Sequence, residues 1–133
     1  SYVIDLIEAI SQTYDKQKKV NISFDIKNID LDIETAMPYG LILNELVTNA
    51  FKYAFKNQKN PQLQITISKQ EDEKILLKVK DSGKGLLGDF SRIANETLGL
   101  RLINMIVKYQ LMGNITYEYE NGAKFIIIGK IKE

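Results

Sequence analysis

The chain has 133 residues, enough for one domain with a real hydrophobic core but hardly for two. Its 18 Lys and Arg balance 17 Asp and Glu, and the resulting formal net charge of +1 argues against binding to nucleic acid or to an anionic membrane. The absence of Cys and His excludes disulfides, thiolate metal sites and every Ser-His-Asp or Cys-His catalytic arrangement.

No apolar run approaches the ~20 residues that span a bilayer, and no signal-peptide pattern opens the chain. The sequence begins at Ser1 in what reads as a helix. We therefore expect residues 1–133 to be a single domain excised from a longer protein, located in the cytoplasm even if its parent is anchored to a membrane.

The first half of the chain predicts a helix, a strand and a second helix. Apolar residues recur at helical spacing from Tyr2 to about Tyr14. Residues 20–26 then alternate strictly between apolar and polar, as in a half-buried strand. The second helix is expected from residue 34 or 35 to about Phe55, with Pro38 in its first turns, where a missing N–H is tolerated.

The second half predicts two hairpins around a further helix. Residues 63–67 and 75–79 alternate on either side of a charged tip, which indicates an antiparallel hairpin. After a loop at residues 86–96, a helix should open at Thr97, be capped by Gly113, and turn four side chains toward a core: Leu102, Ile103, Ile106 and Val107. The last two strands should meet at a type I′ turn on Asn121 and Gly122.

These elements together predict an α+β fold, a two-layer sandwich. About five strands would form a mixed, mainly antiparallel sheet, and three helices would cover one of its faces. The other face should be more polar or should contact a partner.

Four polar side chains fall on roughly one stripe of the second expected helix. Glu45, Asn49, Lys52 and Tyr53 are spaced i, i+4, i+7 and i+8. Their chemistry suits a polyphosphate with a divalent cation, because hard cations take oxygen ligands and an ammonium group attracts phosphate. An ordinary solvated helix face explains the stripe equally well, so the helix alone does not decide between the two.

Two glycine-containing segments follow this helix. Asp81–Gly85 comes directly after a strand; its glycines let the backbone approach a flat ligand, and its carboxylate can accept a hydrogen bond from an exocyclic amine. Thr97–Leu100 opens a helix, and the free N–H groups of a helix N-terminus bind phosphate. Each segment alone is a weak signal, since turns and helix starts of this composition are common.

The order and spacing of the three segments resemble the ATP-binding domain shared by sensor histidine kinases, type II topoisomerases, a heat-shock chaperone and mismatch-repair ATPases. Residues 45–53 are similar to its N box, Asp81–Gly85 to its first glycine box, and Thr97–Leu100 to its second. Within this Bergerat-type superfamily, Asn49–Tyr53 resembles the Asn-Ala-x-Lys-Tyr of histidine kinases, and Glu45 resembles the subgroup that carries Asn-Glu-Leu-x-Thr-Asn-Ala.

The resemblance implies a role for each matched residue. In the N box, Asn49 would ligate Mg²⁺, Lys52 would touch a phosphate and Tyr53 would lie beside the adenine. Glu45 would orient or activate the attacking nucleophile.

In the glycine boxes, Asp81 would accept a hydrogen bond from the adenine amine. Gly83 and Gly85 would shape the pocket and the hinge of a lid. The second box, Thr97–Leu100, would offer the backbone N–H groups of Gly99 and Leu100 to phosphate.

The resemblance further implies transfer of the γ-phosphoryl group of ATP to a histidine on a dimerisation domain outside this chain, for relay to an aspartate of a response regulator. One alternative is a serine protein kinase of the anti-sigma type with the same fold. Another is a degenerate nucleotide-binding module, which Ala123 supports because it stands where the family usually has Thr. Neither nucleic acid nor membrane contact is expected of this domain.

Overall fold

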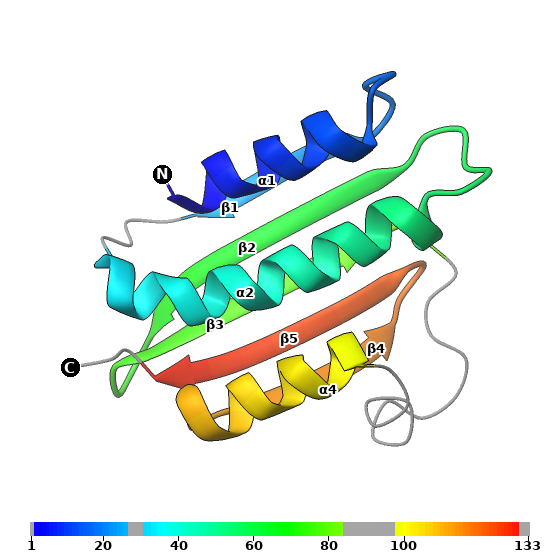
Figure 1. Cartoon of the computed structure of the whole chain (residues 1–133). Helices are drawn as coiled ribbons and strands as arrows, with labels where there is room; N and C mark the ends of the chain where they lie inside the picture. Colours follow the sequence, from blue (N-terminus) through cyan, green and yellow to red (C-terminus); the bar gives the residue numbers. More distant parts are fainter. Residues whose placement is uncertain (1, 27–30, 84–97, 131–133) are drawn as a thin grey trace.

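The computed structural model describes residues 2–26, 31–83 and 98–130. Within these ranges the predicted α+β sandwich is confirmed: a five-stranded sheet carries three helical segments on one face (Figure 1). The strand order is β1-β2-β3-β5-β4. The bounds are Asn21–Ile26 for β1, Gln62–Gln70 for β2, Lys74–Asp81 for β3, Asn114–Tyr119 for β4 and Ala123–Lys130 for β5.

Strands β1 and β2 pair in parallel, and all the other pairs are antiparallel. A parallel pair needs a crossover, which α2 (Ile33–Asn49) supplies. Helix α1 (Tyr2–Tyr14) packs beside α2, and α4 (Leu98–Met105) lies on its other side (Figure 1). The crossover sets α2 in the middle of the helical layer.

Helix α2 begins at a side-chain cap and ends in a wider turn. The Asp32 carboxylate accepts a hydrogen bond from the backbone N–H of Thr35 at 2.9 Å. After Asn49 the chain continues as the π-helical segment η1 (Ala50–Ala54), where the N–H of Phe55 bonds to the carbonyl of Ala50 at 3.1 Å. The predicted extent of this helix, from residue 34 or 35 to about Phe55, therefore agrees with the structure.

The core lies between the helical layer and the sheet. It is made of alternate residues of the strands and one side of each helix, among them Ile42, Val47, Ile65, Leu77 and Ile127, all less than 1 % exposed. The alternation that predicted the strands therefore marks the face that the helices cover.

Helix α4, continued by the π-helical η2 (Ile106–Gln110), departs from the prediction in two details. Leu102 is 48 % exposed instead of facing the core, because the buried side is taken by Leu100, Ile103 and Val107. The left-handed residue after the helix is Met112, at φ 50°, and not Gly113. Gly113 instead donates its N–H to the carbonyl of Val107 at 2.9 Å.

The β4–β5 hairpin is confirmed, but its loop differs from the type I′ turn predicted. Tyr119 pairs with Ala123, so the loop has the three residues between them. Asn121 has a φ of 54° and Gly122 a φ of 150°. A Cβ on Gly122 would collide with the backbone carbonyl oxygen of Asp81, so this glycine serves a close approach to β3.

No helix among the described residues is both long enough and apolar enough to cross a membrane.

Candidate functional site

Helix α2 and the start of α4 meet at a glycine. Gly99, in the first turn of α4, lies against the Glu45 side chain so closely that a Cβ on it would overlap Oε1 and come within 2.5 Å of Cδ. The same Glu45 Oε1 accepts a hydrogen bond from Asn49 Nδ2 at 3.3 Å. The structure thus brings two of the predicted N-box residues together with the second glycine box.

The π-helical turn η1 separates the first two residues of the predicted stripe, Glu45 and Asn49, from the last two, Lys52 and Tyr53. A wider turn changes the angle per residue, so the i+7 and i+8 positions do not follow Asn49 as they would in an α-helix. Lys52 Nζ lies 5.8 Å from the ring centroid of Tyr14, at the end of α1. Tyr53 is 71 % exposed. The structure does not place Lys52 and Tyr53 in one column with Glu45 and Asn49.

The first glycine box closes onto the end of the same helix. A Cβ on Gly83 would lie 2.5 Å from Ala54 Cβ and 2.9 Å from Ala54 Cα. A glycine is therefore needed where the chain that follows β3 packs against η1. Asp81 Oδ1 accepts a hydrogen bond from the N–H of Gly83 at 2.7 Å and one from the N–H of Ala123 at 3.3 Å. Among the described residues, no hydrogen bond is made to Asp81 Oδ2.

Burial raises the pKa of the Asp81 carboxyl above its ordinary value, while the hydrogen bonds from Gly83 and Ala123 lower it in part. A half-buried carboxylate with one oxygen held by two backbone N–H groups has a fixed orientation. Asp81 can therefore present its second oxygen as a directed hydrogen-bond acceptor.

Two contacts around this turn were missed by sequence reasoning. Ser82 Oγ donates to Gln58 Oε1 at 2.7 Å, Gln58 Nε2 donates back to the Ser82 carbonyl, and the N–H of Gln62 bonds to Ser82 Oγ at 2.9 Å. These bonds tie the loop after η1 to the residue following Asp81. The second contact is that of Gly122 with the Asp81 carbonyl. The turn-forming residues of these segments predicted turns, but nothing in the sequence indicated that the turns contact the end of β3.

Part of the predicted site lies outside the described residues, namely Gly85, Thr97 and the expected lid at residues 86–96. Of the second glycine box, the structure describes Leu98, Gly99 and Leu100. The Leu100 side chain is 5 % exposed and belongs to the core, so only its backbone is suited to a ligand.

The side-chain carbonyl oxygen of Asn49 is the candidate ligand for a magnesium ion. Asn49 uses its amide nitrogen toward Glu45, which turns its carbonyl oxygen to the other side. In the described part of the chain, no cluster of three or more acidic, His or Cys residues could form a metal cage. Mg²⁺ usually binds through one or two protein ligands together with water and substrate phosphates, so this donor set fits the ion only in company with a nucleotide.

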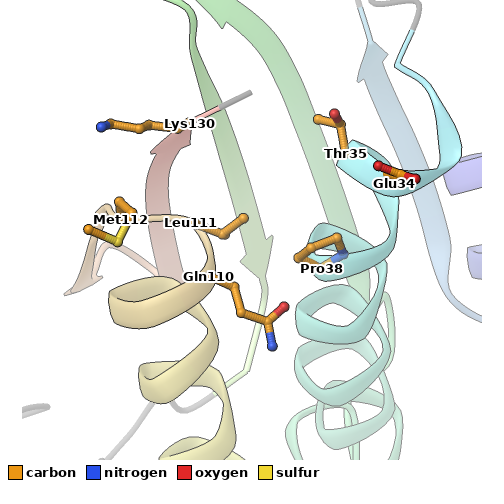
Figure 2. A pocket seen from close by; sticks show the side chains of 7 residues that line it. All are labelled: Glu34, Thr35, Pro38, Gln110, Leu111, Met112 and Lys130. Atoms are coloured by element: carbon orange, nitrogen blue, oxygen red, sulfur yellow. The ribbon is translucent and has the colours of Figure 1, made fainter. Parts of the chain in front are cut away.

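Neither of two hollows in the described structure is lined by Glu45 or Asn49. One, of about 390 Å³, lies between the start of α2 and the end of η2 and is lined by Thr35, Pro38, Gln110, Leu111 and neighbours (Figure 2). Thr35 is 14 residues from Asn49, roughly 20 Å along a helix. The other, of about 490 Å³, adjoins Lys52 and Phe55. The assignment of the site to Glu45 and Asn49 therefore rests on their chemistry and contacts, and not on either hollow.

Comparison with known proteins agrees with the motifs. Residues 35–132 match the family described as histidine kinase-, DNA gyrase B-, and HSP90-like ATPase. The histidine kinase domain of a blue-light-activated histidine kinase from Erythrobacter litoralis has the same fold, with a TM-score of 0.84 and 25 % identity over 98 % of this chain and 59 % of that one. The expected resemblance is confirmed.

Two curated relatives are similar over most of this chain. Blue-light-activated histidine kinase 2 of Erythrobacter litoralis is 31 % identical over 90 residues, which are 68 % of this chain. The sensor histidine kinase PdtaS of Mycolicibacterium smegmatis is 33 % identical over 100 residues, or 74 % of this chain. The chain matches only 25 % and 20 % of the length of these two relatives.

Proposed function

Because the chain belongs to the family of histidine kinase-, DNA gyrase B-, and HSP90-like ATPases, we propose that it is the ATP-binding catalytic domain of a two-component sensor histidine kinase. It transfers the γ-phosphoryl group of Mg·ATP to a histidine on a dimerisation domain. The observation that carries the proposal is the contact of Gly99 with Glu45, which sets the start of α4 against the N box.

The adenine end of the proposed site is organised by Asp81. Its Oδ1 is occupied by two backbone N–H groups, so Oδ2 accepts the hydrogen bond from the adenine 6-amino group. Gly83 keeps the backbone close to η1, and the proposal also assigns a share of the pocket wall to Gly85, which lies outside the described residues. Tyr53, exposed at the end of this helix, covers the adenine. The Ala123 backbone supports Asp81, a role that does not need the family's Thr.

The phosphate end is organised by α2 and α4. Asn49 would hold Mg²⁺ together with the phosphates, and the ion would supply neutralisation of the charge on the transferring group. Gly99 and Leu100 offer backbone N–H groups at the start of α4, in the second box that Thr97 opens. Lys52 leaves Tyr14 and reaches a phosphate. Glu45, fixed by Asn49, orients the incoming imidazole, because phosphoryl transfer depends mainly on positioning and charge stabilisation.

The acceptor must come from elsewhere, since this sequence has no His. An exposed apolar stripe on α4 supports docking of a helical partner. Within α4, Leu98, Leu102 and Met105 follow one another at steps of four and three, and each is 48 % exposed or more. This spacing is that of a coiled-coil seam, so the helices of the dimerisation domain dock here. A response-regulator aspartate then receives the phosphoryl group.

The proposal is tested with ATP labelled at the γ-phosphate. The isolated chain should carry no label, and addition of a protein that contains the parent's dimerisation helices should give label on that partner alone. The bond should be labile to acid and stable to base, as a phosphohistidine is. A base-labile, acid-stable ester would instead identify a serine kinase of the anti-sigma type, and absence of any transfer with ATP bound would identify a binding module.

Asn49→Ala should weaken Mg²⁺-dependent ATP binding about tenfold or more, with the melting temperature nearly unchanged. Asn44→Ala is the matched control, because Asn44 is exposed on the same helix five residues earlier. Equal Mg²⁺ dependence of the two variants would remove Asn49 from the metal site. Glu45→Gln should slow transfer more than it weakens ATP binding.

A further inference from the structure

The sheet face opposite the helices differs sharply between its two halves. On β1 and β2 the residues that alternate with the core positions are polar and, apart from the acidic Asp25, neutral: Asn21, Ser23, Gln62, Gln64, Thr66, Ser68 and Gln70. On β3 the corresponding residues are Lys74, Leu76, Lys78 and Lys80. An ordinary solvated sheet face does not require this concentration of charge on one strand.

Strand β5 adds an apolar centre to the lysine column. Leu76 pairs with Ile128, and Lys78 pairs with Ile126, all on the open face. Ile128 is 37 % exposed, and Leu76 and Ile126 are half-buried without a helix over them. The lysines thus surround a small apolar area, the arrangement of an interface with an apolar centre and a polar rim.

The charges on this half are poorly compensated. Lys80 pairs with Lys124 across the strands and Lys74 pairs with Lys130, although like charges directly opposite one another destabilise a sheet. Lys124 alone has carboxylate partners here, Glu120 at 2.8 Å and Glu118 at 3.5 Å. Within the described residues, Lys74, Lys78 and Lys80 take part in no salt bridge.

The positive charge of these lysines stabilises the ionised form of a carboxyl group in the neighbouring β4–β5 turn. The pKa of the Glu120 carboxyl is lowered, first by its hydrogen bond to Lys124 and then by the charges of Lys124, Lys80 and Lys78. A carboxylate that approaches this face is therefore favoured over a neutral group.

We propose that the open face of β3 and β5 (Lys74, Leu76, Lys78, Lys80, Ile126 and Ile128, here called the β3–β5 face) is a docking surface for an acidic protein surface whose carboxylates surround an apolar centre. Charge complementarity determines this occupant. Phosphate backbones would leave the apolar centre unused, and the chain as a whole carries a formal net charge of only +1. The surface lies on the side of the sheet away from α2 and α4, so its occupation is compatible with nucleotide binding.

The probe is a random copolymer of glutamate and tyrosine, with polyglutamate as the purely anionic comparison. Titration of the isotope-labelled chain should shift the backbone amide resonances of β3 and β5 on this face, and the copolymer should bind more tightly than polyglutamate. Leu76→Thr should abolish that preference for the copolymer. Resonance shifts confined to other surfaces would overturn the proposal.

Charge-reversal variants separate this surface from the net charge of the chain. Lys74→Glu/Lys78→Glu should weaken copolymer binding at least about fivefold and reduce its salt dependence, while ATP binding stays unchanged. The control Lys16→Glu/Lys19→Glu makes the same change in charge at exposed positions after α1 and should have little effect. An equal loss of copolymer affinity in both variants would show that binding depends on the net charge of the chain and not on this surface, and would contradict the proposal.

Duplex DNA and phosphatidylserine vesicles are the remaining arms of the experiment. Both should bind more weakly than the copolymer at equal ionic strength. Tighter binding of either, lost in Lys74→Glu/Lys78→Glu, would assign the β3–β5 face to nucleic acid or to a membrane and overturn the acidic-protein occupant.

Discussion

The two ends of the α2–α4 pair show opposite uses of a close contact. At one end Gly99 meets the tip of the flexible Glu45 side chain, and at the other Gly113 meets the backbone of β5 at Ile128 and Gly129. The hollow of about 390 Å³ lies at the Gly113 end, whereas Glu45 and Asn49 lie at the Gly99 end. We therefore expect the contact of Gly113 with backbone to affect mainly stability, and the contact of Gly99 with the Glu45 side chain to affect mainly activity.

The largest expected effect is on stability at the Gly113 end. In Gly113→Ala the new Cβ would overlap the Ile128 carbonyl and lie 2.8 Å from Gly129 Cα, and neither group can move without displacing β5. We expect a loss of about 3 kcal/mol in the free energy of unfolding, measured by urea denaturation. The folded fraction of the variant should bind ATP normally, because the Gly113 end does not take part in nucleotide binding. A loss of less than about 0.5 kcal/mol in the free energy of unfolding would contradict the importance of the backbone contact.

The next effect is on nucleotide affinity beside the Gly99 end. Asp81→Asn replaces an acceptor with a group that can turn a donor toward the adenine amine, and should cost about 2 kcal/mol of binding, roughly 30-fold in Kd by calorimetry. The variant should be as stable as the parent or more stable at neutral pH. Unchanged ATP affinity would show that the adenine lies elsewhere.

The pH dependence follows from the raised pKa of Asp81. Because the folded state binds this proton more readily than the unfolded state, ionisation of Asp81 costs stability that protonation restores at acid pH. The stability difference between Asp81→Asn and the parent should therefore shrink as the pH falls and vanish below the ordinary Asp value of 3.8. ATP affinity of the parent should begin to fall at a pH above that value.

A smaller effect is expected when Gly99 itself is changed. A Cβ in Gly99→Ala would displace the Glu45 carboxylate and break its bond with Asn49, but a side-chain tip can move at little cost in stability. We expect phosphoryl transfer to the partner to slow about tenfold, equivalent to about 1.4 kcal/mol in the barrier. A melting temperature as low as that of Gly113→Ala would show that the two contacts do not differ in kind.

The smallest effect is at the cap of α2. Asp32→Ala removes the bond to the Thr35 N–H and should cost about 1 kcal/mol of unfolding free energy, with ATP affinity unchanged. Asp32→Asn keeps an acceptor and is the matched control. A change of ATP affinity in Asp32→Ala alone would show that the two ends of α2 are coupled.

The secondary structure and the residue types of the site could be predicted from the amino-acid sequence. Periodicity reports which side chains are buried, so the strands and the extents of α1 and α2 followed from it. The boxes around Asn49, Asp81 and Gly99 were recognised because their order and spacing resemble those of a known family of ATP-binding domains. The fold and the family were predicted correctly on these grounds; the role of each site residue stays a prediction.

The contacts between residues distant in sequence could not be predicted in this way. Periodicity could not place Leu102 outside the core, because the apolar residues of α4 and η2 compete for one buried side, which Leu100, Ile103 and Val107 occupy. Local propensity favours glycine after a helix, yet Met112 takes the left-handed φ, since Gly113 is needed against β5. The contacts of Gly99 with Glu45, Gly83 with Ala54 and Gly122 with Asp81 likewise arise from packing between elements distant in sequence, which no local pattern encodes.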